Sequence, residues 1–232
     1  FAIEERFGDH EMSAAARLES VIEEAHARGI RVMLDLVLNH VHQEHPYLEQ
    51  YPEWFGDGCT CGEEGCDWEE RRLDCWFTDY LPDINHRNHD LMSLVVDDSM
   101  TLVRELDIDG VRIDAAKHMD HAVMRRLSRL LSEGIELSGG ARLPLIGETF
   151  TGSDGHAEIL GYVSDYELDG QFDFPLLYAI RNAFIYGGSF TDLEAASDAG
   201  AAIYGSYLMS PFMGNHDVSR FASEISGQVG NF

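Results

Sequence analysis

The stretch that decides the fold reads DGVRIDAAKHM and occupies residues 109–119. It begins as a short apolar strand and runs into a cluster of ionisable side chains. Because successive side chains of a strand point to opposite faces, Arg112 and Asp114 share one face while Val111 and Ile113 share the other. The arginine favours the ionised carboxylate, which suits a nucleophile and equally suits a structural ion pair at a strand end.

Outward from this stretch, strand patterns alternate with helical patterns. Short apolar runs predict strands at 30–38, 111–114, 143–150, near 172–174 and near 207–213, and helical spacing predicts helices at 12–28, 91–106, 120–133 and 175–186. The run at 30–38 is nearly continuous, which is typical of a strand buried on both faces. The alternation indicates a parallel sheet, as an eight-stranded barrel or a doubly wound sheet.

Three carboxylates follow three different predicted strands. They are Asp114, Glu148 and Asp217, and a closed barrel directs the carboxyl ends of its strands to one mouth. The chain has 42 acidic residues, so some of them end strands by chance. The pattern alone therefore does not decide whether these three form a site.

The charge balance excludes some partners. Sixteen basic residues face 42 acidic ones, for a net charge of −26, which repels the phosphates of nucleic acids. A neutral polar ligand such as a sugar is not opposed by this charge. No apolar run approaches the ~18 residues that a membrane span needs, so no span is predicted.

All four cysteines lie between Cys59 and Cys75, with Cys61 and Cys66 between them. One or two disulfides, a zinc site and free thiols are all compatible with this cluster. Zinc is less favoured because no two-residue gap separates paired ligands and no histidine lies inside. Disulfides would place the protein outside the cytoplasm, in an extracellular or periplasmic compartment.

The segment 41–88 loses regular periodicity and is longer than an ordinary connection. We interpret it as an inserted subdomain that contains the cysteines. Its tryptophans, Trp54, Trp68 and Trp76, are candidates either for stacking on sugar rings or for the small core of the subdomain.

Five separated segments resemble the alpha-amylase family of glycoside hydrolases. They are DLVLNH at 35–40, LPDIN at 81–85, GVRIDAAKH at 110–118, GETF at 147–150 and FMGNHD at 212–217. They follow the family's order at compatible spacings and cover most of the chain.

The resemblance implies an incomplete (β/α)₈ TIM barrel over 1–232, holding about strands 3 to 7. The subdomain 41–88 would be inserted after strand 3. The N-terminal strands, the last strand and the C-terminal β-domain would be missing, so we expect the chain alone to be poorly stable and weakly active or inactive.

The resemblance also implies a retaining hydrolase that cleaves alpha-1,4-glucosidic bonds in starch-like alpha-glucans. Asp114 matches the nucleophile, Glu148 the general acid and base, and Asp217 the carboxylate that stabilises the transition state. Such a mechanism passes through a covalent glycosyl-enzyme and needs the first two carboxyl groups about 5 to 5.5 Å apart.

Five residues match substrate-binding positions of the family. Arg112 matches the residue that keeps the nucleophile ionised, and Lys117 and His118 match residues that line sites beyond the scissile bond. His40 and His216 match residues that contact the sugar before it, and without the motifs they would read as ordinary hydrogen-bonded histidines. The other histidines are expected on the surface or in loops: His10, His26, His42, His45, His86, His89, His121 and His156.

Calcium is implied by the same resemblance. Asn39, Asp83 and the backbone carbonyl of His118 match family ligands, and all three offer hard oxygen atoms. In the alternative interpretation, Asn39 and Asp83 only hydrogen-bond to backbone.

The subfamily stays open on the sequence. LPDIN combines the start typical of alpha-amylases with the final Asn of alpha-1,6-acting relatives, and the KH pair at 117–118 favours alpha-1,4 specificity. Cyclomaltodextrinases, alpha-glucosidases and transglycosylases share the catalytic residues. A non-catalytic carbohydrate-binding or transporter-accessory relative is the alternative of another class, and the complete set of carboxylates argues against it. The oligomeric state is not indicated.

Overall fold

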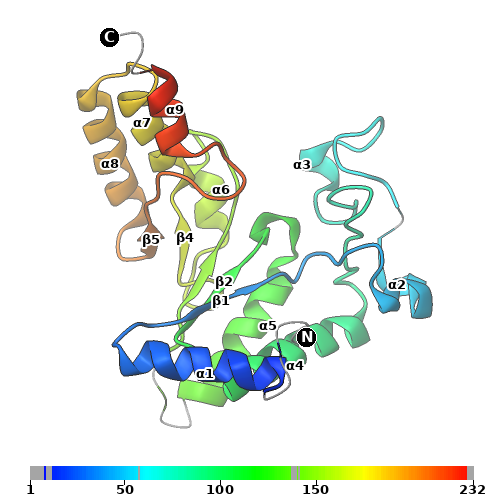
Figure 1. Ribbon diagram of the computed structural model, residues 1–232. Coiled ribbons are helices and arrows are strands. Elements are labelled where there is room, and N and C mark those ends of the chain that lie inside the picture. The colour runs from blue at the N-terminus through cyan, green and yellow to red at the C-terminus, as the bar shows by residue number, and fades with distance from the viewer. Residues whose placement is uncertain (1–7, 9–11, 57, 137–139, 141, 229–232) are drawn as a thin grey trace. The chain divides into compact units, whose positions relative to one another are not determined.

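The computed structural model describes residues 8, 12–56, 58–136, 140 and 142–228. It divides into two compact units, Phe1–Leu145 and Ile146–Phe232, which we call the first and second units and describe one at a time (Figure 1). No helix in the described part of the chain is long and apolar enough to cross a membrane.

In the first unit, two parallel strands are accompanied by helices. The elements are α1 (Ala14–Ala27), β1 (Met33–Leu36), α2 (Pro46–Gln50), η2 (Pro52–Trp54), α3 (Trp68–Arg71), α4 (His89–Leu106), β2 (Gly110–Ile113), η3 (Ala116–His118), α5 (His121–Leu131) and the π-helical η4 (Ser132–Glu136). β1 and β2 pair in parallel, with Asp35 opposite Arg112. The helices expected at 12–28, 91–106 and 120–133 are confirmed as α1, α4 and α5.

Side-chain caps explain where these helices start. Ser13, Asn88 and Asp120 each accept a backbone N–H from the first turn of α1, α4 and α5. Gly29 lies beyond the end of α1 with a φ of +73°, a conformation that glycine adopts without steric cost. The helix ends are therefore encoded locally.

The second unit contains β3 (Leu145–Gly147, which begins at the last residue of the first unit), α6 (His156–Gly161), β4 (Gly170–Phe172), α7 (Phe174–Phe184), α8 (Phe190–Tyr204), β5 (Leu208–Ser210) and α9 (Phe221–Gln228). β4 pairs in parallel with both β3 and β5. Helices α7 and α8 pack side by side (Figure 1). The strands predicted near 172–174 and 207–213 and the helix at 175–186 are confirmed within a few residues, whereas α6, α8 and α9 were not predicted.

Each unit buries its own apolar side chains. Ile113, Met124 and Leu127 are fully buried in the first unit, and Phe174 and Leu177 in the second. Burying a side chain of this size contributes about 1.5–3 kcal/mol. These contacts hold the strand ends from which the candidate site residues extend.

The expectation that the strand at 30–38 is buried on both faces is wrong. Leu36 and Leu38 are buried, but Met33 is 48% exposed and Val37 39% exposed. Side chains alternate between the two faces of a strand, so the odd-numbered positions lie on an open face. The continuous apolar run did not reveal which face packs.

The segment 41–88 is mostly irregular and contributes to two small buried clusters. In one, Phe55 and Ile84 of the segment pack with Leu91 of α4, and Trp54 packs against them, which supports a core role for this tryptophan. The other contains only cysteines. The boundaries of an inserted subdomain stay a prediction.

Candidate active site

An ion-pair cluster lies at the carboxyl ends of β1 and β2. Nη1 of Arg112 is 2.7 Å from Oδ1 of Asp114 and 2.7 Å from both carboxylate oxygens of Asp35. The side chains of Arg112 and Asp114 are only 13% and 19% exposed, whereas that of Asp35 is 51% exposed. The predicted Arg112–Asp114 pair is thus confirmed, with Asp35 as an unforeseen third member that parallel pairing places opposite the arginine.

The backbone turns sharply after Asp114. The Asp114 N–H donates to the carbonyl of Leu36, 3.1 Å away, so the residue is still held against the end of β1. Ala115 then adopts the left-handed region with a φ of +47° and precedes η3. This conformation costs a non-glycine residue about 1 kcal/mol or more, and such strain is frequent at functional sites. The turn brings His118 back towards the strand ends.

Two histidines lie near this cluster. Nδ1 of His118 donates to the carbonyl of Arg72 at 3.2 Å, and burial together with the charge of Lys117 lowers the pKa of His118 to about 4. The imidazole is therefore neutral near pH 7, with Nε2 free of a proton as an acceptor. Burial also lowers the pKa of His40, against the opposing effect of Asp114.

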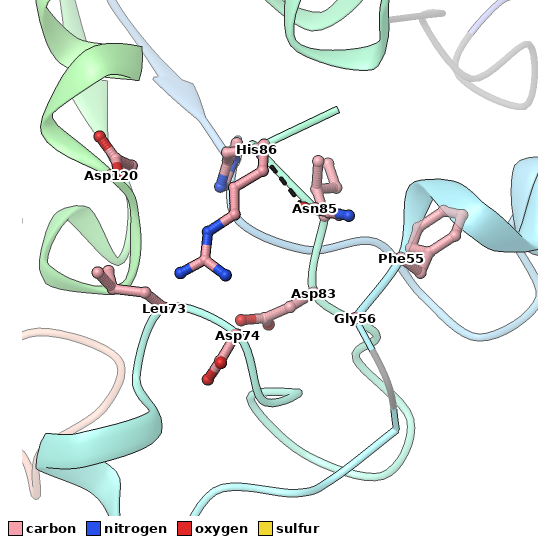
Figure 2. Close-up of a pocket in the computed structure, with 10 residues that line it drawn as sticks. Phe55, Gly56, Leu73, Asp74, Asp83, Asn85, His86 and Asp120 are labelled. Carbon is pink, nitrogen blue, oxygen red and sulfur yellow. Dashed lines mark hydrogen bonds between the residues drawn. The ribbon is translucent and has the colours of Figure 1, made fainter. Parts of the chain in front are cut away.

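Asn39 and Asp83, the two candidate calcium ligands with side-chain oxygens, are in direct contact. Nδ2 of Asn39 donates to Oδ1 of Asp83 at 3.0 Å, and the Phe77 N–H donates to the same oxygen at 3.1 Å. Burial is the main cause that raises the pKa of Asp83 to about 8. Asp83 also lines a cavity of about 320 Å³ with Asp74 and Asp120 (Figure 2). Arg87 and His86 line the same cavity, so its lining combines acidic and basic side chains.

Glu148 follows β3 in the second unit and is 7% exposed. The preceding residue, Gly147, lies close to a neighbouring side chain: a Cβ atom there would approach Cδ1 of Leu168 to 2.4 Å. A larger residue here would force the buried Leu168 side chain to shift. The close packing fixes the backbone from which the Glu148 side chain extends.

Asp217 lies in a loop of the second unit after β5. Oδ1 of Asn215 accepts the N–H groups of Asp217 at 3.0 Å and of Val218 at 3.1 Å, which forms a local turn. The side chains of His216 and Asp217 are 73% and 43% exposed. The GNHD motif thus presents both side chains on a turn that its own asparagine stabilises.

A buried arginine on α7 holds this loop at both ends. Nη1 of Arg181 donates to the carbonyls of Met213 at 3.3 Å and Ser219 at 3.1 Å, and Nη2 pairs with Glu224. The Tyr186 hydroxyl donates to the same carboxylate at 2.9 Å. Our sequence analysis missed Arg181, because an arginine in the middle of an apolar helix carries no motif that links it to a distant loop.

One histidine outside the motifs makes a long-range contact. His86 lies in a turn, within the expected surface or loop positions, and it is partly buried, with its Nε2 donating to the carbonyl of Leu38 at 2.9 Å. Burial is the main cause that lowers the pKa of His86. His10 lies outside the described residues.

The predicted site residues fall into two groups. The first unit brings together Arg112, Asp114, His40 and His118, with the Asn39–Asp83 pair nearby in sequence and structure. The second unit carries Glu148, His216 and Asp217. The meeting of all three carboxylates around one sugar bond stays a prediction.

Parallel strands that alternate with helices and carry carboxylates and histidines at their carboxyl ends define the class of α/β-barrel enzymes. Within that class, the alpha-amylase catalytic domain model matches residues 1–231, and the chain belongs to this family. The fold is accordingly a partial (β/α)₈ barrel.

Curated relatives support the same family. Alpha-amylase 2 of Schizosaccharomyces pombe is 29% identical over 95% of this chain, and a beta/alpha-amylase of Paenibacillus polymyxa is 25% identical over 96%. Among solved structures, an alpha-amylase from Geobacillus thermoleovorans in complex with acarbose matches 95% of this chain with a TM-score of 0.79 and 26% identity. The chain spans 38% and 18% of those two relatives and 48% of that structure.

Proposed function

We propose that this chain is part of a retaining glycoside hydrolase that cleaves alpha-1,4-glucosidic bonds in starch-like alpha-glucans. The observation that carries the proposal is the partly buried Arg112–Asp114 pair at the carboxyl end of β2. A nucleophilic carboxylate must be held in place, and the guanidinium of Arg112, which donates to Oδ1 of Asp114 at 2.7 Å, does this. Family membership supplies the reaction class.

In the proposed reaction, the Asp114 carboxylate attacks the anomeric carbon while Glu148 protonates the departing glycosidic oxygen. The products are a glycosyl ester on Asp114 and a shortened glucan. Glu148 then takes a proton from water, which attacks the anomeric carbon and releases Asp114. Asp217 would stabilise the positive charge that develops on the sugar ring in both steps.

The histidines are suited to sugar hydroxyl groups. His118 offers Nε2 as an acceptor because Nδ1 already donates to Arg72. His40 and His216 would contact the sugar before the scissile bond, and Lys117 would contact the sugars beyond it. The neutral imidazoles of His40 and His118 would contact uncharged hydroxyl groups without the desolvation cost of a charged group.

A structural calcium ion fits the donor atoms of the first unit. Oδ1 of Asn39 is buried and has no hydrogen-bond partner among the described residues, and the Asp83 carboxylate is 3% exposed. Both are oxygen ligands that calcium prefers, and the carbonyl of His118 would be the third. The ion would tie the 41–88 segment to the end of β1.

The binding partner, the location and the substrate specificity of the enzyme follow from other observations. A glucan is the proposed partner, and the acidity of the chain disfavours nucleic acid. The Cys59–Cys75 disulfide supports an extracellular or periplasmic location. A cyclomaltodextrinase of Bacillus sp. is 23% identical over 98% of this chain, so products from starch, pullulan and cyclodextrins would distinguish that specificity from an alpha-amylase.

The decisive test uses Asp114→Asn and Glu148→Gln in the whole protein that contains this chain. Each should lower starch hydrolysis by roughly 10³-fold or more, because each removes an essential chemical group. With an alpha-glucosyl fluoride, whose leaving group needs no proton, Glu148→Gln should still form the glycosyl-enzyme, visible as added mass, and Asp114→Asn should not.

Asp90→Asn is the matched control, because the Asp90 side chain is 93% exposed on α4. It should keep the parent activity. Substantial starch hydrolysis by a purified, folded Asp114→Asn protein would overturn the proposal.

A further inference from the structure

Four cysteines from one short loop of the first unit gather in one place. Cys59 and Cys75 form a disulfide, and Cys61 and Cys66 are buried free thiols. The buried part of this cluster contains no residue type other than cysteine, with Cys61 and Cys66 each 7% exposed and Cys75 0% exposed. A loop without an apolar core of its own needs a cross-link or a metal ion to hold it.

Three of the four sulfur atoms lie close enough together to contact one ion. Sγ of Cys66 is 3.5 Å from Sγ of Cys75, and the sulfurs of Cys59, Cys66 and Cys75 all lie within 4.8 Å of one another. Cys59 and Cys75 are bonded to each other in the disulfide, so reduction has to separate these two sulfurs to the spacing of zinc ligands. Four thiolates placed tetrahedrally at 2.3 Å from zinc are about 3.8 Å apart. Cys61 packs in the same cluster, with its Sγ 3.9 Å from the carbonyl of Cys75.

The backbone brings the four positions together independently of the disulfide. The Cys61 N–H donates to the carbonyl of Trp76, and the Trp76 N–H donates to the carbonyl of Cys59. The Gly62 N–H donates to the carbonyl of Cys66 at 2.8 Å, in a turn where Gly62 and Gly65 have positive φ. Glycine takes this conformation without strain. The cluster is therefore built by the loop itself.

The two free thiols do not resemble reactive ones. Cys61 and Cys66 are each only 7% exposed, whereas reactive cysteines are partly exposed. The single disulfide also gives no role to the other two cysteines, Cys61 and Cys66. A structural role for all four sulfurs accounts for both observations.

We propose that the reduced four-cysteine cluster binds one Zn²⁺ ion through Cys59, Cys61, Cys66 and Cys75. A dithiol reduces the Cys59–Cys75 bond to two thiols and is itself oxidised to a cyclic disulfide. Zinc then displaces the protons of the four thiols, which pass to solvent, and forms four zinc–sulfur bonds. The disulfide form is the oxidised, metal-free state of the same loop.

Soft thiolates select zinc over calcium, so this site is chemically distinct from the oxygen ligands at Asn39 and Asp83. The cysteine loop also contacts a candidate site residue. Trp68 is the first residue of α3, which lies between Cys66 and Cys75 in the sequence, and its ring centroid lies 5.4 Å from that of His118. Zinc or the disulfide would hold α3 in the position that contacts this histidine.

The test uses the whole protein that contains this chain, after reduction with a dithiol and removal of the reductant under argon. Titration with Co²⁺ should give one equivalent of bound metal, with the thiolate charge-transfer and tetrahedral d–d absorption bands that oxygen ligands do not produce. Zinc should then displace the cobalt and bleach these bands. Cys66→Ser should weaken the affinity by at least about tenfold because a thiolate ligand is lost.

Glu64→Gln is the matched control, since it removes an exposed carboxylate from the same loop and should leave cobalt binding unchanged. If Cys66→Ser does not fold, alkylation of the reduced parent chain replaces it: zinc should protect all four cysteines. Failure of the reduced chain to bind cobalt or zinc, a spectrum without thiolate bands, or four cysteines alkylated equally fast with and without zinc would overturn the proposal.

Discussion

The two regions that carry candidate catalytic carboxylates are held in different ways. In the first unit, Asp114 is 19% exposed and is fixed by the side chain of Arg112, two residues before it on the same strand. In the second unit, Asp217 is 43% exposed and lies on a loop whose backbone is fixed by Arg181, far away in sequence. One arginine binds the carboxylate itself, and the other binds the chain around it.

The comparison shows that Asp114 is held by a charged side chain that contacts its carboxylate, whereas Asp217 is held by the position of its backbone. A nucleophile has to stay ionised and aligned, so a direct ion pair serves it. A carboxylate that only stabilises charge on the sugar needs its place fixed, and buried hydrogen bonds to carbonyls do that without competing for its oxygens. The following predictions test this contrast.

The largest effect is expected from Arg112→Met. It leaves Asp114 without its partner in a mostly buried position, so the free energy of unfolding should fall by about 3 kcal/mol and hydrolysis should be nearly lost. Urea unfolding and a starch assay measure the two effects. Asp35→Asn is the control, because the Asp35 side chain is 51% exposed, so the loss of its ion pair with Arg112 should cost less than about 1 kcal/mol. Equal effects for the two variants would contradict the contrast.

Arg181→Met should lower the free energy of unfolding by about 2–3 kcal/mol, because Glu224 and two carbonyls lose a buried partner. Hydrogen exchange should rise in peptides covering 213–219 and stay unchanged at 110–118. Activity should fall through kcat more than through KM, since the loop would be displaced and the contacts of the first unit retained. Tyr186→Phe removes one hydrogen bond to Glu224 and should cost about 1 kcal/mol. Unchanged exchange at 213–219 in Arg181→Met would show that the arginine does not hold the loop.

Removal of calcium should destabilise the first region alone. A ligand present at 100 times its dissociation constant stabilises the folded state by about 2.7 kcal/mol. Chelation should therefore lower the melting temperature, and added Ca²⁺ should restore it, in the parent chain but not in Asp83→Asn. Hydrogen exchange should increase around 39 and 83 and not around 213–219. A melt unaffected by chelation would count against the site.

The smallest effect is expected in how the free energy of unfolding changes as the pH falls. Burial lowers the folded-state pKa of His86 below its ordinary value of 6.5, so the unfolded chain binds more protons than the folded chain in that interval. Stability contributed by the neutral imidazole is present above pH 6.5 and is lost as the pH falls through the lower, folded-state pKa. Urea unfolding at pH 7.5, 6.5 and 5.5 should show a smaller loss for His86→Gln than for the parent. A parallel decline in both would remove His86 as a cause.

The sequence predicted those features whose causes are local. Ser13, Asn88 and Asp120 cap helices from adjacent positions, and the helices they start were predicted within three residues. The Arg112–Asp114 pair was predicted because the period of a strand places them on one face. Helix α8 was missed because its small residues give little contrast between a buried and an exposed face.

The features that the sequence could not predict depend on chain segments far apart. Asp35 joins Arg112 only because β1 and β2 pair in register, and His86 reaches the carbonyl of Leu38 only after the intervening loop has folded. The pairing of Cys59 with Cys75, among several that four cysteines allow, was likewise a tertiary outcome.

By itself, the sequence determined the family, the order of the five strands and of helices α1, α4, α5 and α7, and the types of residue at the strand ends, because motifs and periodicity are properties of neighbouring residues. The tertiary structure decided which side chains became buried, which histidines became neutral, and which arginine holds the GNHD loop. Burial and pairing depend on contacts between distant segments, and these contacts exist only in the folded chain.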